Sequence, residues 1–262
     1  MRAAGILEGG DHSPLNADQS RDHHYAMNEP ILEAVDVVKS LGAGAGRVNA
    51  LRGVSIALRG GELTLLMGPS GSGKTTLLSV LGCILTPTSG TVRVAGRSTE
   101  GAGPEDLSKL RREHIGFIFQ SYHLFPTLTA LDNVRLALDV RGEAARSAEA
   151  KAKEAIAMVG LSHKIHSYPR ELSGGEQQRV AIARAIAGSP SAILADEPTA
   201  ALDSVNGQVV MRVLAEIAKD PARAVLVVAH DPRIVPFANR IIHIEDGRIV
   251  DVEPGAAGSS PT

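Results

Sequence analysis

Cysteine, tryptophan and long apolar runs are almost absent from this sequence. Its 262 residues include one cysteine, Cys83, and no tryptophan. A single cysteine excludes an internal disulfide framework and fits a reducing compartment, so we expect Cys83 to be a small buried hydrophobic residue. No stretch of the sequence approaches the roughly 18 consecutive apolar residues that a membrane-spanning helix needs. The sequence therefore argues against both a disulfide-rich scaffold and a membrane span.

The charge balance is also unremarkable. The net charge is −2, and no run of basic residues gives a reason to expect a nucleic-acid partner. With 44% hydrophobic and 21% charged residues, the composition is that of a globular protein able to bury a core. The length allows one or two domains.

The two ends of the chain differ from its middle. Residues 1–29 are polar and lack the apolar stretch of a signal peptide, and we read them as a disordered leader. Residues 252–262 are rich in glycine, serine and proline, and we expect a flexible tail. A folded domain is predicted over residues 30–251.

Short apolar runs alternate with helical patterns along this domain, which predicts an α/β fold with a parallel sheet and crossover helices. Asp246 and Gly247 lie between two apolar runs and predict a hairpin turn. Residues 121–170 contain two helices rich in alanine and charge with no strand between them, which indicates a helical insert. Strands are predicted at 31–38, 54–58, 62–67, 116–119, 191–196 and 223–230.

The segment GPSGSGKTT, residues 68–76, matches the phosphate-loop pattern G-x-x-x-x-G-K-[ST]. It follows a predicted strand and opens a predicted helix, which is the context that this loop requires. Gly71 and Gly73 let successive N–H groups turn toward a β-phosphate. Lys74 then reaches the β- and γ-phosphates, and the Thr75 hydroxyl is placed for Mg²⁺. The predicted nucleotide-binding residues are Gly68, Pro69, Ser70, Gly71, Ser72, Gly73, Lys74, Thr75 and Thr76.

Two adjacent carboxylates follow a second buried strand. Asp196 ends the run SAILAD, where a carboxylate can hold the water shell of Mg²⁺. Glu197 comes next and is predicted to orient or deprotonate the water that attacks the γ-phosphate. Alone, such a pair of carboxylates is as compatible with simple surface charge as with a catalytic role. The phosphate loop upstream favours the catalytic role.

The segment LSGGEQQR, residues 172–179, combines a helix start with two glycines. Ser173 and Glu176 have the spacing of a capping box. Gly174 and Gly175 lie in the first turn, where each glycine costs up to about 1 kcal/mol relative to alanine. Bare backbone at a helix N-terminus suits a phosphate, so the segment predicts a second phosphate site.

Together these segments resemble the ATP-binding subunits of ATP-binding cassette (ABC) transporters over residues 31–250. LLMGPSGSGKTT resembles the family's Walker A motif, ILADEPT its Walker B motif and LSGGEQQR its signature. Gln120 in GFIFQ matches the Q-loop glutamine, Asp203 ends the D-loop, and His230 in VVAHD matches the switch histidine. The resemblance implies a P-loop core of mixed sheet with an antiparallel β subdomain and an α-helical subdomain at about 121–170.

The resemblance also implies a mechanism in which two ATP-binding subunits clamp two nucleotides head to tail. Ser173, Gly174 and Gly175 of one subunit would then reach the γ-phosphate of the nucleotide on the other. In the family pattern the hydrolytic residues are Glu197, His230, Lys74 and Gln120, and the Mg²⁺ ligands are Thr75, Gln120 and Asp196.

The strings QSYHLFPTLTALDNV and VLGC are similar to the macrolide-exporter, lipoprotein-releasing and heterocyst glycolipid-exporter branch. This similarity implies a subunit peripheral to the cytoplasmic face of the membrane, driving export or extraction of a lipid, lipoprotein or drug-like substrate. The family docks its permease beside the Q-loop, although YHLF also suits packing of the helical insert. The chain shows no fused membrane domain, so we expect the permease on a separate chain, and it ends soon after His230, in contrast to importer ATPases that append a C-terminal regulatory domain.

Two alternatives remain open: the energy subunit of a small-solute importer, and a soluble ABC ATPase acting on DNA or ribosomes. The latter class normally adds coiled coils or a second cassette. One departure from the family concerns the adenine base. Leu41 stands where an aromatic residue is expected, and it offers apolar contact without stacking.

Overall fold

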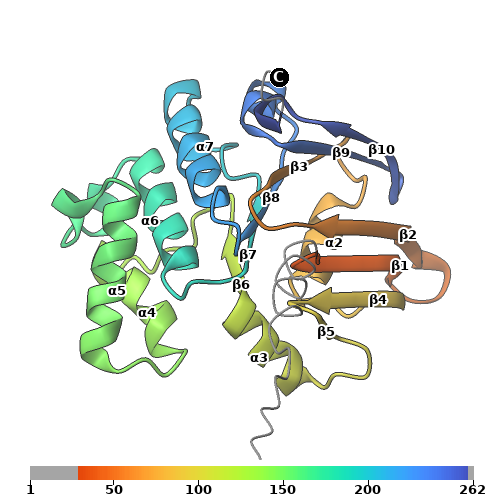
Figure 1. Cartoon of the computed structure of the whole chain (residues 1–262), viewed down its shortest axis with the longest axis horizontal. Helices are drawn as coiled ribbons and strands as arrows, with labels where there is room; N and C mark the ends of the chain where they lie inside the picture. The colour runs from red at the N-terminus through yellow and green to blue at the C-terminus, as the bar shows by residue number, and fades with distance from the viewer. Residues whose placement is uncertain (1–28, 259–262) are drawn as a thin grey trace, which may run out of the picture.

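The computed structural model describes residues 29–258, in which two sheets of different character lie side by side (Figure 1). A six-stranded sheet has the order β10-β9-β3-β8-β7-β6, and a four-stranded antiparallel sheet has the order β2-β1-β4-β5. The strands of the larger sheet are β3 (Leu63–Met67), β6 (Ile115–Ile118), β7 (Ala192–Asp196), β8 (Ala224–Val228), β9 (Arg240–Glu245) and β10 (Arg248–Pro254); those of the smaller are β1 (Leu32–Leu41), β2 (Val48–Leu58), β4 (Ser89–Val94) and β5 (Arg97–Ser98).

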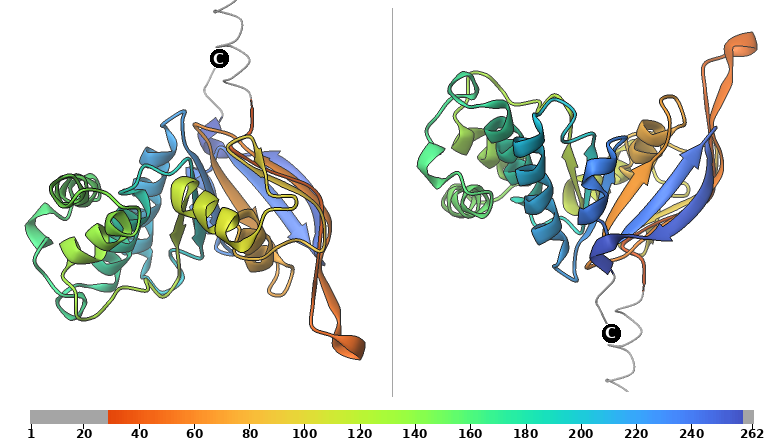
Figure 2. Two further views of the ribbon diagram at one scale, coloured as in Figure 1. Left: turned by 90° about the horizontal axis from the view of Figure 1, so that it is seen from below. Right: turned by 90° about the horizontal axis from the view of Figure 1, so that it is seen from above.

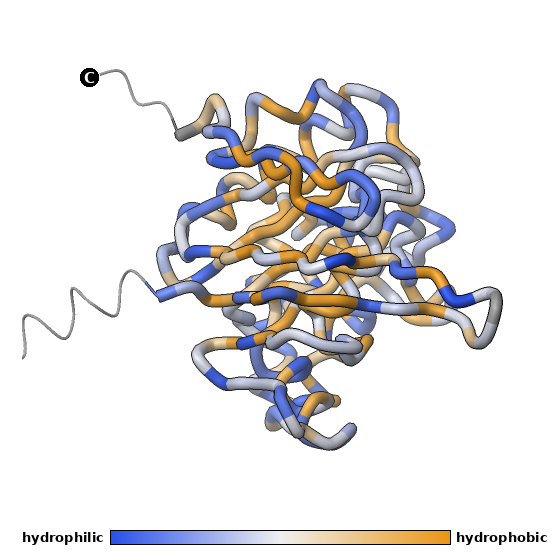
Figure 3. Tube along the Cα trace, turned by 90° about the vertical axis from the view of Figure 1, so that its right-hand side faces the viewer, coloured by the Kyte–Doolittle hydropathy of each residue, from blue (hydrophilic) through white to orange (hydrophobic). Residues whose placement is uncertain are grey.

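The central strands of the larger sheet are parallel and buried on both faces. All five residues of β8 are buried, as are four of the five in β3 and in β7. Such strands read as continuous runs of valine, leucine, isoleucine and alanine because helices or a second sheet cover both faces. Figure 3 shows apolar residues concentrated in the inner stretches of the chain and polar residues in several of its outer loops.

The edge strand β10 runs antiparallel to β9 and makes the sheet mixed. Asp246 and Gly247 join the two strands with φ of 45° and 74°, the backbone of a type I′ hairpin turn. The predicted hairpin is therefore confirmed. β10 continues to Pro254 because Val252 and Pro254 still pair with β9, so the strand extends into the segment predicted as a tail. Residues 1–28 of the predicted leader lie outside the described residues.

Helices cover the two faces of the larger sheet with separate hydrophobic cores. One core joins α2 to the four-stranded sheet, and Leu77 and Leu81 are fully buried in it. The other core joins the opposite face to α4, α5, α6 and α7. The helices are α2 (Lys74–Leu81), α3 (Pro104–His114), α4 (Ala130–Asp139), α5 (Ala145–Met158), α6 (Gly174–Ile186) and α7 (Ser204–Ala218), with 3-10 turns at Gly44–Gly46, Ser162–Lys164, Pro169–Glu171, Pro232–Phe237 and Ala256–Gly258.

The helical part of the molecule projects to one side. α4 and α5 pack on each other and on α6, at the end of the molecule opposite the antiparallel sheet (Figure 1). Ala148, Ala152 and Ala155 form the buried face of α5. The predicted mixed sheet, antiparallel β subdomain and helical insertion are thereby confirmed.

Two expectations that follow from composition are met within residues 29–258. No helix in this part of the chain has the length and apolarity to cross a bilayer. Cys83 is buried just after α2, and its burial raises the pKa of the thiol to about 11. The cysteine is therefore a core residue in the structure.

Candidate functional site

The phosphate loop connects β3 to α2 and lies at the carboxyl end of the parallel strands. Gly73 has φ of 102°, and a Cβ there would lie 2.5 Å from the Ala50 carbonyl of β2. Gly71 has φ of 79° and has no neighbouring atom within 4 Å of a Cβ position. Gly73 precedes α2 without a side-chain cap, so the first N–H groups of this helix are free for an anion.

Lys74 spans the mouth of this loop. Its Nζ donates to the carbonyl oxygens of Gly68 at 2.8 Å and Pro69 at 2.7 Å. The side chain is 8% exposed, and the Ser72 hydroxyl beside it is buried without a hydrogen-bond partner. A buried ammonium with one hydrogen still available is suited to an anionic ligand in the loop.

A cavity of about 690 Å³ opens over the loop. Most of the phosphate-loop residues line it from one side, and Leu41, Ala50, Glu197 and His230 line it from the others. Leu41 is 41% exposed and contributes an aliphatic wall. The cavity therefore joins a cationic, N–H-rich floor to an apolar flank and to a carboxylate.

Thr75 and Asp196 form a pair of oxygen donors beside Lys74. The Thr75 hydroxyl donates to Asp196 Oδ1 at 3.3 Å. Burial raises the pKa of the Asp196 carboxyl, and the Glu197 charge raises it further, whereas the hydrogen bond from Thr75 and the charge of Lys74 lower it. A hydroxyl and a carboxylate suit a hard divalent cation.

Thr75 and Asp196 fit an Mg²⁺ ion that is bound partly by the protein and partly by a phosphate ligand. Among residues 29–258 no cluster of three or more histidine, cysteine, aspartate or glutamate side chains could hold a metal by itself. Mg²⁺ usually keeps several waters and binds through one or two carboxylates together with substrate phosphates. The donor set therefore fits that ion only when a phosphate ligand completes it.

Glu197 and His230 lie in contact with each other in the wall of the cavity. Glu197 directly follows β7 with φ of 47°, and its N–H donates to the Val228 carbonyl at 3.0 Å. His230 Nδ1 lies 3.3 Å from Glu197 Oε1, and the histidine side chain is 65% exposed. A non-glycine residue in the left-handed region is uncommon and is enriched at functional sites.

Sheet order explains why these residues meet. β3, β8 and β7 are adjacent and parallel, so the residues that follow them gather at one edge of the sheet. The phosphate loop follows β3, Ala229 and His230 follow β8, and Asp196 ends β7 with Glu197 directly after it. Ligands of open α/β sheets bind outside these carboxyl ends.

Gln120 is not part of this cluster. It lies in a turn after β6, it is exposed, and it does not line the cavity. β6 is separated from β3 by β7 and β8, which explains the displacement. The roles predicted for Gln120 as a metal ligand and in hydrolysis thus remain predictions.

The signature segment forms its predicted capping box but lies away from the cavity. Ser173 Oγ accepts from the Glu176 N–H at 3.2 Å, and Glu176 Oε2 accepts from the Ser173 N–H at 2.8 Å. The latter bond is the main reason why the pKa of the Glu176 carboxyl is lowered. Ser173, Gly174 and Gly175 do not line the cavity that holds Lys74. The chain therefore carries two separate sets of predicted phosphate-binding residues.

Some residues that support the site were not predicted. Ala50 of β2 contacts both the cavity and the phosphate loop. The Gly247 N–H donates to the Ser72 carbonyl at 3.0 Å, so the β9–β10 turn braces the loop. An alanine in a strand gives no sequence signal of such a role; Gly247 was assigned only to its hairpin.

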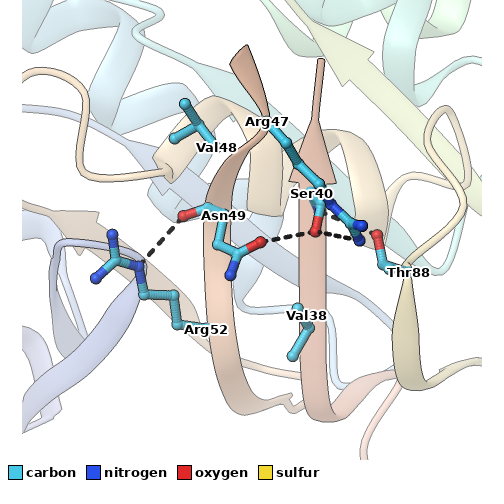
Figure 4. Close-up of a pocket in the computed structure, with 7 residues that line it drawn as sticks. All are labelled: Val38, Ser40, Arg47, Val48, Asn49, Arg52 and Thr88. Atoms are coloured by element: carbon cyan, nitrogen blue, oxygen red, sulfur yellow. Dashed lines mark hydrogen bonds between the residues drawn. The ribbon is translucent and has the colours of Figure 1, made fainter. Parts of the chain in front are cut away.

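A second depression, of about 550 Å³, lies on the antiparallel sheet (Figure 4). Its polar groups pair with each other: Arg47 donates to Ser40, Ser40 donates to Asn49, and Arg52 donates to the Asn49 carbonyl. These bonds tie together the β1–β2 hairpin, which reaches away from the rest of the molecule (Figure 2). The depression is therefore part of a hairpin surface whose polar groups bond to one another.

Comparison with known proteins gives concordant results. A family model described as "ABC transporter" matches residues 51–200. The macrolide export ATP-binding/permease protein MacB of Salmonella typhimurium is 46% identical over 224 residues, which is 86% of this chain and 34% of that protein. MacB of Escherichia coli K12 is 44% identical over 225 residues, covering 86% and 35% respectively. The chain thus spans about a third of the length of these relatives.

Two solved structures are similar over nearly the whole of their own chains. One is the dimeric post-hydrolysis state of the ATP-binding cassette MJ0796 bound to ADP and Pi, with a TM-score of 0.77 and 39% identity over 85% of this chain and 98% of that chain. The other is cbiO1 of Clostridium perfringens, described as part of a transporter complex, with a TM-score of 0.78 and 26% identity over 87% and 89%.

Proposed function

The chain belongs to the ABC transporter family, an ATP-binding family, and from this premise we propose that it hydrolyses ATP as a head-to-tail dimer to drive a membrane permease. The observation that carries the proposal is the cavity lined by the phosphate loop, Glu197 and His230, with Asp196 hydrogen-bonded to the lining residue Thr75. Together these residues would give one bound nucleotide a phosphate-binding loop, a pair of metal donors and a carboxylate.

Phosphate binding would rest on the loop and on Lys74. The free N–H groups at the start of α2 and the loop from Gly68 to Thr76 would hold the nucleotide phosphates, and Lys74 would neutralise their charge from inside the loop. Thr75 and Asp196 would hold Mg²⁺, which when bound neutralises charge on the β- and γ-phosphates. Gln120 would reach the site only after its segment moves.

Glu197 is proposed to orient and deprotonate the attacking water. Its carboxylate lies at the end of β7, where the left-handed backbone turns the side chain toward the cavity. His230 would hold that carboxylate through the 3.3 Å contact and detect the γ-phosphate with its exposed ring. A positioned group of this kind contributes about 10²–10⁴-fold to a rate.

The distribution of the predicted phosphate-binding residues supports the proposed head-to-tail dimer. At the N-terminus of α6, Ser173 is exposed, Gly174 is half-exposed and Gly175 is buried. All three lie outside the chain's own cavity. We propose that they act on the nucleotide of a second copy. The dimeric state of the MJ0796 cassette supports this arrangement.

The permease is proposed to dock in a groove of about 540 Å³ between β6, α4 and α6. Phe117, Phe119 and Phe125 line it, and Phe125 is half exposed. Arg111, Arg112, Arg141 and Arg184 also line it, so the groove combines an aromatic floor with positive charge. A permease segment with apolar and acidic side chains fits this combination.

Export or extraction of a lipid, lipoprotein or drug-like substrate is the transport reaction we propose. It is supported by the similarity to macrolide export proteins, which combine ATP-binding and permease functions in their names. The alternative is that the chain energises a small-solute importer. The protein that co-purifies with the chain distinguishes the two functions: a permease with a large extracytoplasmic domain indicates export, and a substrate-binding protein indicates import.

The variant Glu197→Gln tests the hydrolytic assignment. We expect Mg²⁺-dependent ATPase activity to fall by at least about 10²-fold while ATP still binds and drives dimer formation. Glu216→Gln is the matched control, because Glu216 is an exposed carboxylate on α7 that pairs with Lys219. Near-normal turnover of Glu197→Gln would remove Glu197 from the mechanism.

A further inference from the structure

The first turn of α6 contacts two other segments of its own chain at its two glycines. A Cβ on Gly174 would lie 2.9 Å from the Tyr122 hydroxyl oxygen. A Cβ on Gly175 would lie 2.6 Å from Asn206 Oδ1 and 2.9 Å from Asn206 Cγ. Real Cβ atoms essentially never approach other atoms below 3.0 Å. Each glycine thus leaves room that a specific side chain occupies.

Tyr122 is held against α6 by bonds at both ends of its segment. The Arg184 guanidinium on α6 donates to the Tyr122 carbonyl at 2.8 Å and to the His123 carbonyl. Buried Gln178, also on α6, donates to the Phe119 carbonyl at 3.4 Å. Tyr122 and His123 have φ of 59° and 49°, which non-glycine residues rarely adopt without such support.

The same bonds tie Gln120 to α6. Phe119 precedes Gln120, and Tyr122 follows it by two residues, and both are anchored on α6. His123 and Arg184 also line the aromatic groove. The segment that carries Gln120, the groove wall and the first turn of α6 therefore form one connected unit.

Asn206 is fixed from the opposite side by the start of α7. Asp203 caps this helix by accepting from the N–H groups of Val205 and Asn206, each at 3.0 Å. The Asn206 side chain donates to Asp203 Oδ2 at 2.6 Å, so its amide group cannot turn freely. Its Oδ1 lies against buried Gly175. The start of α7 is thereby set against the first turn of α6.

We propose that Tyr122 and Asn206 are positioning residues that set the direction of the first turn of α6, and with it where Ser173 and the glycine N–H groups face. The proposal rests on the proposed function, in which this turn contacts the nucleotide of a second copy. Gly174 and Gly175 then serve contacts inside their own chain as well as bare backbone toward a phosphate.

Crossed pairs of substitutions test the proposal in the full chain. Gly174→Ala and Gly175→Ala are each made alone, with Tyr122→Phe and with Asn206→Ala. Tyr122→Phe removes only the hydroxyl that meets Gly174. Asn206→Ala removes the Oδ1 and Cγ atoms, the two that would lie below 3.0 Å from a Cβ on Gly175, and keeps the Asn206 Cβ at 3.0 Å. Each second substitution is thus the matched control for the other glycine.

Three quantities are measured: ATPase turnover, Mg²⁺-ATP-driven dimer formation in a Glu197→Gln background, and binding of a fluorescent ATP analogue to the monomer. Either glycine substitution should lower dimer formation about tenfold, the effect of a modestly overpacked contact. Nucleotide affinity of the monomer should stay within about twofold, because these residues do not line the cavity. Thermal unfolding confirms that each variant is folded.

The expected result is specific rescue. Tyr122→Phe should restore dimer formation to Gly174→Ala but not to Gly175→Ala, and Asn206→Ala should do the reverse. Failure of both rescues in folded variants, or rescue of both glycines by either substitution, overturns the proposal. A wild-type chain that neither hydrolyses ATP nor dimerises refutes the proposed function and this inference with it, whereas an active wild type without crossed rescue refutes the inference alone.

Discussion

Two inactive variants should recover ATPase activity when they are mixed, because each phosphate-binding set is proposed to act on a different chain. In Lys74→Ala the cavity loses its ammonium while the first turn of α6 stays intact. In Ser173→Asp the first turn gains a carboxylate while the cavity stays intact. Each homodimer then carries a defect in both sites. A mixed dimer confines both defects to one site and leaves the other intact.

The structure sets the size of each defect. Lys74 Nζ holds two loop carbonyls at 2.8 and 2.7 Å, and loss of a preorganised charged donor at a reacting phosphate costs about 10²–10³-fold in rate. Aspartate caps a helix as well as serine does, so α6 keeps its start. A carboxylate about 4 Å from a phosphate charge costs roughly 4 kcal/mol at the effective dielectric near a protein surface. Ser173→Asn is the neutral control that also caps.

The assay is phosphate release across mixing ratios at constant total protein. With random pairing, half of the dimers in an equal mixture are mixed and each has one working site, so about a quarter of wild-type activity is expected. The activity should peak at equal amounts and vanish at either end. Ser173→Asn should remain active, and thermal unfolding should show that all variants are folded.

Cross-linking of ATP-driven dimers is the second measurement, since hydrolysis that requires both sites would abolish turnover in the mixed dimer. A mixture as inactive as its parents in both assays would refute the reasoning. The segment LSGGEQQR would then serve the nucleotide of its own chain, and the head-to-tail arrangement would be wrong.

Three further outcomes are expected. Leu41→Tyr should tighten ATP binding by about tenfold, because a stacked base contributes about 1–3 kcal/mol. It should also sharpen the weak preference for ATP over GTP that we expect of the aliphatic wall. Equilibrium titration with both nucleotides checks this, and an unchanged ATP dissociation constant means that the base lies elsewhere. Because the folded-state pKa of Glu176 is lowered, its capping bond should stabilise the protein above the unfolded pKa and lose that effect as pH falls through the folded pKa. Thermal unfolding from pH 7 to 3 should show a smaller acid-induced loss of stability in Glu176→Gln than in the wild type. Identical pH profiles would contradict the role. Expressed alone, the chain should fractionate away from membranes, and with its permease it should sediment with them; membrane binding without any permease would refute a peripheral attachment through that partner.

The sequence predicts the strands and loops of the site well, because local chemistry determines them. The buried runs that form β3, β7 and β8 are apolar except for Thr64 and the terminal Asp196, and Lys74 and Thr75 fall where a helix begins. The Ser173–Glu176 box also depends only on spacing along one helix. Such features need no knowledge of distant residues.

The tertiary relations could not be predicted in this way. β4 and α3 went unassigned, since the strand SGTVRV alternates weakly and the helix is highly polar. The contacts of Gly174 with Tyr122 and of Gly175 with Asn206 depend on how α6 lies against two remote segments. The glycines alone indicated a phosphate site, and only the packing around them reveals a second reason for their small size.

The brace between Gly247 and Ser72 has a consequence for synthesis of the chain on the ribosome. β3 lies between β8 and β9, so the strand that precedes the phosphate loop has neither neighbour until residues 224–245 have emerged. The bond from the Gly247 N–H to the Ser72 carbonyl must form later still. The four-stranded sheet, whose strands all precede residue 99, can assemble early, since folding during synthesis proceeds from the N-terminal side. A nascent chain therefore acquires the brace on its phosphate loop only when the β9–β10 turn has left the exit tunnel, more than 170 residues after the loop itself (Thr76 to Gly247).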